Sequence, residues 1–205
     1  MLLDPNRIVE LLQRFRGRFV ANRRLKASAI MMILFNSSPS RTAELQTHIL
    51  LIERARDYSR HSGQIAFPGG KIEALDSSPL EAALRETKEE IGIDRGQLML
   101  LGSMGFFRTL TSGFDASVHL GWAVQPLSWK PRQQEVASVL EIPLADLYAQ
   151  FKPGLLLHRR VDLMNLHFHW QIPDSQRQVC IWGLTARVLH CFFQMLQIEQ
   201  GEYNI

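Results

Sequence analysis

The chain has 205 residues, 46% of them hydrophobic, which is enough for one large domain with a full hydrophobic core. Its formal net charge of +3 suits an anionic substrate but is too small to indicate nucleic-acid binding. The sequence shows neither an uncharged apolar run of about 18 residues nor a signal peptide, so we expect a soluble, cytoplasmic protein. Its two cysteines, Cys180 and Cys191, are then expected to be reduced and buried.

The predicted elements follow an order typical of one α/β domain. Helical spacing of apolar residues predicts a leading helix within residues 5–16. Short apolar runs bounded by turn residues predict strands at 27–35, 47–53, 98–107, 117–124, 136–144 and 166–172. We expect the first two strands to form a hairpin and the last to lie at a sheet edge. We therefore assign residues 1–205 to a single domain with a leading helix in 1–26, a core in 27–175 and an apolar C-terminal helix in 180–199.

The best-specified helix is predicted within SSPLEAALRETKEEIG, residues 77–92. Residues 78–81 match a capping box with Pro79 in the first turn, and Gly92 lies where helices commonly end. The apolar stripe of this helix consists of Leu80, Leu84, Thr87 and Ile91. Three carboxylates converge on the opposite side, those of Glu86, Glu89 and Glu90.

These carboxylates form either a solvated helix face or the ligands of a cation. Only two cations, Arg85 and Lys88, lie close by in the same segment, and glutamates cannot pair with one another. The Pro-Gly-Gly turn at residues 68–70 is expected to bring backbone close to whatever the carboxylates hold. Because hard oxygen ligands suit Mg²⁺ or Mn²⁺, and such ions usually bind together with substrate phosphates, we favour the metal site.

The segment GGKIEALDSSPLEAALRETKEEIGI, residues 69–93, resembles the Nudix box. The family pattern is Gly-x5-Glu-x7-Arg-Glu-U-x-Glu-Glu-x-Gly-U, where U is aliphatic, and the matching residues are Gly70, Arg85, Glu86, Glu89, Glu90, Gly92 and Ile93. This sequence departs from the pattern in three ways: Asp76 replaces the first Glu, one extra residue precedes Arg85, and Thr87 occupies an aliphatic position.

The resemblance implies an α/β/α sandwich on a mixed β-sheet and hydrolysis of a nucleoside diphosphate linked to another moiety. It also implies metal ligands from Gly70, Glu86, Glu89 and Glu90, with Glu89 a candidate catalytic residue. Arg85 would hold the glutamates in place by bidentate hydrogen bonds. Glu135 precedes a predicted strand, where Nudix enzymes often place a further acid, and is either such a catalytic residue or an exposed loop glutamate.

The preceding segment LLIERARDYSRHSGQIAFPGG, residues 50–70, resembles a motif of the coenzyme A pyrophosphatase branch of this family. The resemblance implies that coenzyme A or an acyl-coenzyme A is cleaved to 3′,5′-ADP and a 4′-phosphopantetheine. Candidate substrate-binding residues are Arg54, Arg60, Gln64, Phe67, Gly69, Gly70 and Lys71, of which the cations suit phosphate groups. For Phe67 we favour packing over base stacking, and the loop 109–115 is a candidate lining of the substrate pocket.

Other functions remain as alternatives. One is a Nudix hydrolase for another nucleotide, and another is a non-catalytic nucleotide-binding module, which the three retained glutamates disfavour. Nucleic-acid and membrane partners are not expected: the only basic stretch with interleaved aromatic residues, 14–26, reads more simply as a helix packing face. A homodimer is one candidate assembly. The spacing of His158, His167 and His169 suits no compact metal site, and the pair at 167 and 169 is expected to share one strand face for packing.

Overall fold

The computed structural model describes residues 1–15, 25–38, 44–55, 63–109, 113–124, 127–153 and 164–197. A seven-stranded sheet contains β1 (Lys26–Ser37), β2 (Gln46–Arg54), β3 (Ile65–Ala66), β4 (Gly69–Lys71), β5 (Leu98–Arg108), β6 (Phe114–Ala123) and β7 (Val136–Pro143). A separate two-stranded ribbon consists of β8 (His167–Gln171) and β9 (Gln178–Trp182). The helices are α1 (Pro5–Arg14), α2 (Pro79–Ile91), the short 3-10 helix η1 (Arg95–Gln97), α3 (Leu144–Tyr148) and α5 (Gly183–Gln197).

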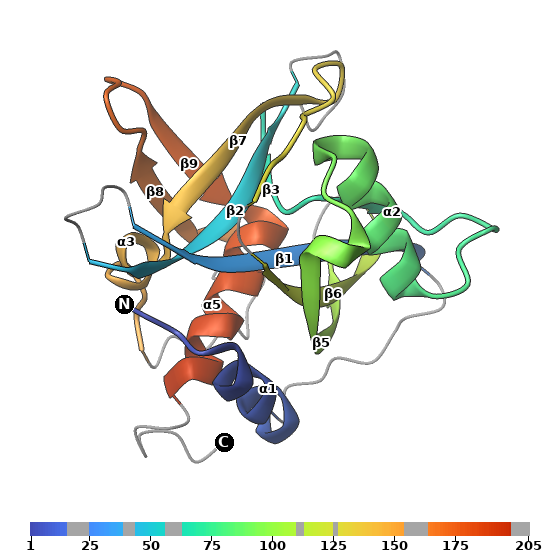
Figure 1. The fold of residues 1–205 in the computed structure, drawn as a ribbon, viewed down its shortest axis with the longest axis horizontal. Coiled ribbons are helices and arrows are strands. Elements are labelled where there is room, and N and C mark those ends of the chain that lie inside the picture. The colour runs from blue at the N-terminus through green and yellow to red at the C-terminus, as the bar shows by residue number, and fades with distance from the viewer. Residues whose placement is uncertain are drawn as a thin grey trace.

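Strand β1 lies at the centre of the sheet and has two different neighbours along one edge. Its second half forms the expected antiparallel hairpin with β2, with Ile33 opposite Leu50. Its first half pairs with β4, which places Ala29 opposite Gly70. Strand β6 runs parallel to the other edge of β1, and all other pairs are antiparallel, so the sheet is mixed. The divergence of β2 from β1 leaves room for the short strands β3 and β4 (Figure 1).

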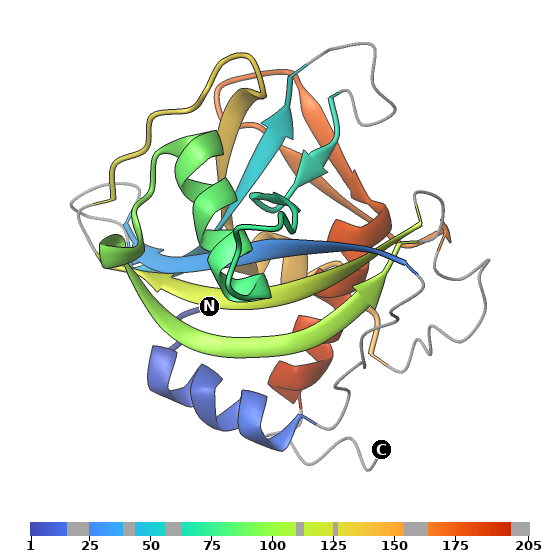
Figure 2. The same cartoon turned by 90° about the vertical axis from the view of Figure 1, so that its right-hand side faces the viewer.

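Helices cover both faces of the sheet, which confirms the predicted α/β/α sandwich. Helix α2 contributes Ala82, Ala83, Leu84 and Ile91 to one hydrophobic cluster. Helices α1 and α5 pack on the opposite face, in a second cluster that includes Ile8, Leu11, Phe192 and Phe193. Figure 2 shows the sheet between α2 on one side and α1 with α5 on the other. None of the helices in the described part of the chain has the length and hydrophobicity that a membrane crossing requires.

Helix α2 begins and ends as its sequence predicts. The Ser78 hydroxyl accepts a hydrogen bond from the Glu81 amide at 3.2 Å, and Gly92 ends the helix in the left-handed region with φ 73°. The Glu81 carboxylate pairs with Arg95. Thr87 is buried at its aliphatic position with its polar group satisfied, because its hydroxyl donates to the Ala83 carbonyl at 2.7 Å.

The C-terminal part of the chain differs from the prediction in three respects. The strand expected at 166–172 is present, but it pairs with β9 in the separate ribbon, not at an edge of the main sheet. Because β9 extends to Trp182, the last helix begins at Gly183 and not at residue 180. Cys180 lies on the outer face of β9 and is exposed, contrary to the expected buried thiol, whereas Cys191 is partly buried. Residues alternate between faces along a strand, so a cysteine two positions before Trp182 shares its exposed face.

Gly69 is required by the close approach of β4 to β1. Its φ is 147°, and a Cβ placed there would lie 2.3 Å from the Ala29 carbonyl oxygen and 2.7 Å from the Ile30 Cα. We expect Gly69→Ala to lower the free energy of unfolding by about 3 kcal/mol, because neither backbone atom can move aside. Thermal unfolding would then shift down by roughly 6–12 °C.

The matched control is Gly113→Ala. Gly113 also has a positive φ, 73°, but no heavy atom lies within 4 Å of its Cβ position. The alanine there should therefore lower the free energy of unfolding only by the conformational strain of the positive φ, about 1 kcal/mol. Equal destabilisation by both substitutions would show that steric exclusion at Gly69 is not the cause.

Candidate active site

Backbone and carboxylates meet where the glycine pair of β4 crosses helix α2. The Gly69 amide donates a hydrogen bond to a Glu90 carboxylate oxygen at 2.9 Å. A Cβ on Gly70 would lie 2.4 Å from the carboxyl carbon and from Oε1 of Glu86, so only glycine leaves room for this side chain. The Pro-Gly-Gly turn thus brings backbone against the glutamates, as its composition predicts.

Arg85 links the acidic groups around this crossing. Its guanidinium forms a bidentate pair with Asp76, through Nε and Nη2 at 3.0 Å each. Its Nη1 contacts Glu86 at 3.0 Å and Glu89 at 3.4 Å, while Nη2 also donates to the Lys71 carbonyl at 3.0 Å. The expectation of bidentate bonds to the glutamates was therefore wrong: the fork geometry of arginine is matched by Asp76, and each of these two glutamates receives a single contact.

Asp76 is thus the anchor of Arg85, although it replaces the Glu of the family pattern. The hydrogen bonds from Arg85, and then from the Glu73 amide, hold the pKa of Asp76 below its usual range. The Asp76 carboxylate therefore stays ionised and fixes the guanidinium in place. The extra residue before Arg85 is accommodated in the turn before α2, between Asp76 and the cap at Ser78.

Glu90 is the buried member of the acidic group, with an exposed fraction of 1%. Its carboxylate faces the Gly69 amide and the Arg54 guanidinium, the latter at 3.6 Å. The solvated helix face, which was the disfavoured alternative, does not describe this residue, because β4 and Arg54 cover it. Burial raises the pKa of Glu90 to about 7, although the Gly69 amide and Arg54 both favour the ionised form.

Glu135 reaches the site through a connection that the sequence pattern does not reveal. The amides of Lys130 and Arg132 donate to the last carbonyls of α2, on Ile91 and Glu90, at 2.7 and 2.9 Å. This docks the connector against the helix end, and the Glu135 carboxylate lies near enough to raise the pKa values of Glu86 and Glu90 after the larger effect of burial. Glu135 also pairs with Arg132 at 3.0 Å.

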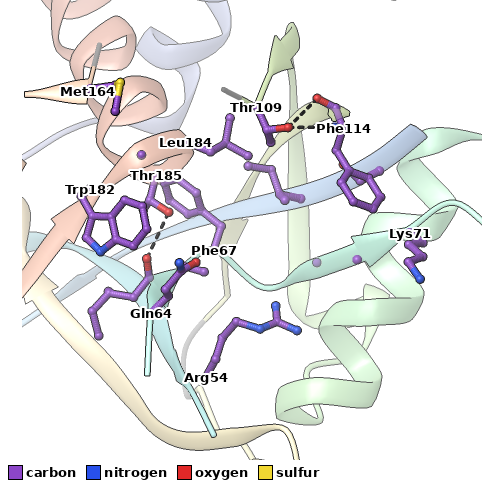
Figure 3. Close-up of a pocket in the computed structure, with 17 residues that line it drawn as sticks. Arg54, Gln64, Phe67, Lys71, Thr109, Phe114, Met164, Trp182, Leu184 and Thr185 are labelled. Carbon is purple, nitrogen blue, oxygen red and sulfur yellow. Dashed lines mark hydrogen bonds between the residues drawn. The ribbon is translucent and has the colours of Figure 1, made fainter. Parts of the chain in front are cut away.

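A cavity of about 320 Å³ lies beside the glycine pair (Figure 3). The described residues predicted to bind substrate all line it, namely Arg54, Gln64, Phe67, Gly69, Gly70 and Lys71. Arg60 lies outside the described residues. Phe67 is 2% exposed and belongs to the hydrophobic core, as favoured, while one edge of it reaches the cavity. Thr109 and Phe114, from the loop expected to line the pocket, are also in the wall.

The remaining wall comes from parts of the chain far away in sequence. Strand β1 contributes Ser28 and Ile30, and the C-terminal region contributes Met164 and residues 182–185. The Thr185 hydroxyl donates to the Ile65 carbonyl at 3.1 Å, which ties the start of α5 to β3. The carboxylates of α2 lie next to this cavity behind Gly69 and Gly70 and do not form its lining.

Comparison with known proteins agrees with this geometry. The model of the NUDIX domain family matches residues 25–161. The chain belongs to the Nudix family. A Nudix hydrolase is an enzyme that acts on nucleoside diphosphate derivatives, and this chain shares the domain that does so.

Relatives and one solved structure are similar over most of the chain. An uncharacterized Nudix hydrolase, NudL, of Pectobacterium atrosepticum is 30% identical over 80% of this chain and 79% of its own length. The NudL protein of Yersinia enterocolitica is 31% identical over 89% of this chain and 86% of its own length. The crystal structure of a MutT/nudix family protein from Enterococcus faecalis covers 96% of this chain and 70% of its own, with a TM-score of 0.55 and 14% identity, which shows a shared fold.

Nudix hydrolases generally use divalent metal ions, and the donors found here fit a hard cation. Glu86 and Glu89 face the same arginine nitrogen, and the missing Cβ at Gly70 lets the Glu86 carboxylate lie directly against the β4 backbone. The pKa of Glu86 is raised, first by burial and then by the charges of Glu89 and Glu135, so an added cation would relieve both penalties. Among the described residues no three His, Cys, Asp or Glu side chains are grouped as ligands of one ion; Arg85 contacts both Glu86 and Glu89, and Arg54 contacts Glu90.

The raised pKa of Glu90 makes the stability of the metal-free Nudix domain depend on pH. Between the ordinary carboxyl value of 4.5 and about 7, the unfolded chain is ionised while the folded chain keeps the proton. The folded state binds more protons, so stability should fall as pH rises through this range, by up to about 3 kcal/mol. We expect the melting temperature in EDTA to decrease from pH 5 to pH 8, and Glu90→Gln to flatten the decrease.

Glu81→Gln is the control for the pH dependence of the melting temperature. Glu81 lies on the same helix and pairs with Arg95, with its side chain 44% exposed, so this variant should keep the wild-type slope. Parallel curves for wild type and Glu90→Gln would contradict a protonated Glu90 in the folded state.

Proposed function

We propose that this Nudix hydrolase cleaves the diphosphate bond of coenzyme A or an acyl-coenzyme A, with Mg²⁺ or Mn²⁺, to 3′,5′-ADP and the corresponding 4′-phosphopantetheine. The main support for this proposal is a single cavity that lies directly beside the glutamates of α2 and is lined by Arg54, Gln64, Phe67, Gly69 and Gly70. These residues belong to the segment that resembles the coenzyme A pyrophosphatase motif. We further propose that the leading helix, the core and the C-terminal helix act as a single domain.

Each site residue has a role in this proposal. Glu86, Glu89 and Glu90, with the Gly70 backbone, would hold the metal ions, which lower the pKa of the attacking water and neutralise charge on the phosphoryl oxygens. Arg85, fixed by Asp76, holds Glu86 and Glu89 in position. Glu89 is the most exposed of these glutamates, with 46% of its side chain accessible, and would orient the attacking water or accept its proton.

Cations at the cavity would bind the substrate phosphates. Arg54 and Lys71 line the cavity on either side of the glycine pair, and Arg54 can offer two parallel N–H groups to a phosphate. The backbone at Gly69 and Gly70 can approach the diphosphate closely because it carries no side chains. Glu135 is proposed as a further acid that accepts a proton or completes the metal site. The two free cysteines agree with a reducing, cytoplasmic location.

The test is product analysis of purified protein by liquid chromatography and mass spectrometry. Coenzyme A, ADP-ribose, NADH and 8-oxo-dGTP are incubated separately with Mg²⁺, with Mn²⁺ and with EDTA. Metal-dependent release of 3′,5′-ADP from coenzyme A, and from no other compound at a comparable rate, is the expected result. Faster turnover of another member of the panel would keep the Nudix chemistry and replace the substrate by that nucleotide.

A further inference from the structure

The cavity beside the glycine pair has two chemically different ends. Arg54 and Lys71 lie at the end near the glutamates, and Figure 3 shows the Arg54 side chain rising between Gln64 and Lys71. At the opposite end, Trp182 and Met164 face the cavity, with Leu184 beside them (Figure 3). None of the described lining residues at this second end carries a charge. A ligand that fits both ends therefore has an anionic part and an uncharged, apolar part.

Trp182 and Met164 expose more surface than packing alone would leave. Their exposed fractions are 46% and 54%, whereas Trp122 and Trp170 are 9% and 8% exposed and Trp129 is partly buried against the core. A large exposed apolar surface inside a cavity is characteristic of a binding site. Two described lining residues near this end carry hydroxyls, Thr185 and Thr109. These hydroxyls donate to the Ile65 and Phe114 carbonyls, so neither donor proton is available to select a polar group (Figure 3).

The position of Trp182 is fixed by the ribbon behind it. The inward-facing residues of β8 and β9, among them Phe168 and Ile181, are fully buried in the core. At the other end of the ribbon, Arg177 pairs with the buried Glu53 of β2. Trp182 is therefore held as a preformed wall, which reduces the entropy lost when an apolar group packs against it.

We propose that Trp182, with Met164 and Leu184, forms the subsite for an apolar segment on the far side of the diphosphate, and that Trp182 sets a preference for acylated over free coenzyme A. This inference rests on the proposed function. At about 320 Å³ the cavity is at the lower limit for small-molecule sites, so it encloses a part of such a substrate rather than all of it. With the diphosphate at Arg54 and Lys71, the enclosed part is the chain that extends toward Trp182.

The experiment compares kcat/KM for coenzyme A, acetyl-coenzyme A and hexanoyl-coenzyme A in wild type, Trp182→Ala and Trp182→Phe. Loss of the indole should lower kcat/KM for the hexanoyl compound by about tenfold, mainly through KM, and should lower that for free coenzyme A by a smaller factor. Trp182→Phe should recover most of the loss, because an aromatic surface remains. His167→Ala is the matched control: His167 lies opposite Trp182 on the same exposed ribbon face and outside the cavity lining.

A binding measurement separates this inference from the proposed reaction. Calorimetric titration in EDTA should show wild type binding hexanoyl-coenzyme A about tenfold more tightly than coenzyme A, and Trp182→Ala binding both equally. Equal losses for all three compounds would overturn the acyl preference, since the compounds share both the nucleotide and the pantetheine arm and one of these shared parts would then lie against Trp182. If wild type binds hexanoyl-coenzyme A more tightly than coenzyme A but hydrolyses neither, the proposed reaction is wrong and the apolar subsite at Trp182 is retained.

Discussion

Glu89→Gln is expected to lower kcat by roughly 10²–10³-fold while the protein stays folded. The substitution keeps the shape of the side chain and removes the charge and the strong oxygen donor that the proposed chemistry requires. Its structural cost is small, because the carboxylate is 46% exposed and contacts Arg85 at 3.4 Å. The melting temperature should change by less than about 2 °C. Steady-state release of 3′,5′-ADP and a thermal melt of the same preparation measure both quantities.

Glu81→Gln supplies the control for this experiment. It removes a glutamate from the same helix without touching Glu86, Glu89 or Glu90, so kcat should remain within about twofold of wild type. Full activity of Glu89→Gln would remove this residue from the metal and catalytic roles assigned to it. An active Glu89→Gln/Glu90→Gln double variant would exclude the metal site on α2 altogether.

Gly70→Ala is expected to reduce activity by about 10²-fold with little loss of stability. The added Cβ would lie 2.4–2.6 Å from three atoms of the Glu86 carboxyl group, so that group must move. Because it is the end of a flexible side chain and the Gly70 φ is outside the left-handed region, the fold can absorb the change. Catalysis cannot, since a displacement of about 1 Å in a metal ligand or its neighbours is costly. Activity and melting temperature are again measured together.

The control here is Gly96→Ala, at a position where no heavy atom lies within 4 Å of the new Cβ. It should leave both activity and melting temperature unchanged. The contrast with Gly69→Ala is equally informative, because there the Cβ meets backbone and the expected loss is in stability. Wild-type activity of Gly70→Ala would show that the Glu86 carboxylate is not held against this glycine in the working enzyme.

Local patterns predicted the parts of this molecule that depend on near neighbours in sequence. The cap at Ser78 and the end at Gly92 are decided by hydrogen bonds within a few residues, and both are confirmed. The strands of the main sheet follow from short apolar runs, although β3 and β4 are too short to give a periodic signal. The ribbon strand β9 was missed because the apolar residues around Cys180 continue without a break into α5.

Long-range packing decided what the patterns could not. The carboxylates of α2 look equivalent on a helical wheel, yet Glu90 is buried because β4 turns back over it, and Arg85 takes Asp76 as its bidentate partner because the loop before the helix folds against it. Glu135 approaches the site only because its connector satisfies the open carbonyls at the end of α2.

The cavity illustrates the same division. The segment from Arg54 to Lys71 carries the residues of one wall, and its resemblance to a family motif, together with its cations, predicted a phosphate-binding function. The opposite wall, with Met164 and Trp182, is more than ninety positions away along the chain and carries no motif that points to a site. The acidic helix and the glycine turn could be predicted in advance, since they depend on residue type and short spacing. Which apolar surfaces face the cavity could not, because burial depends on how distant segments pack.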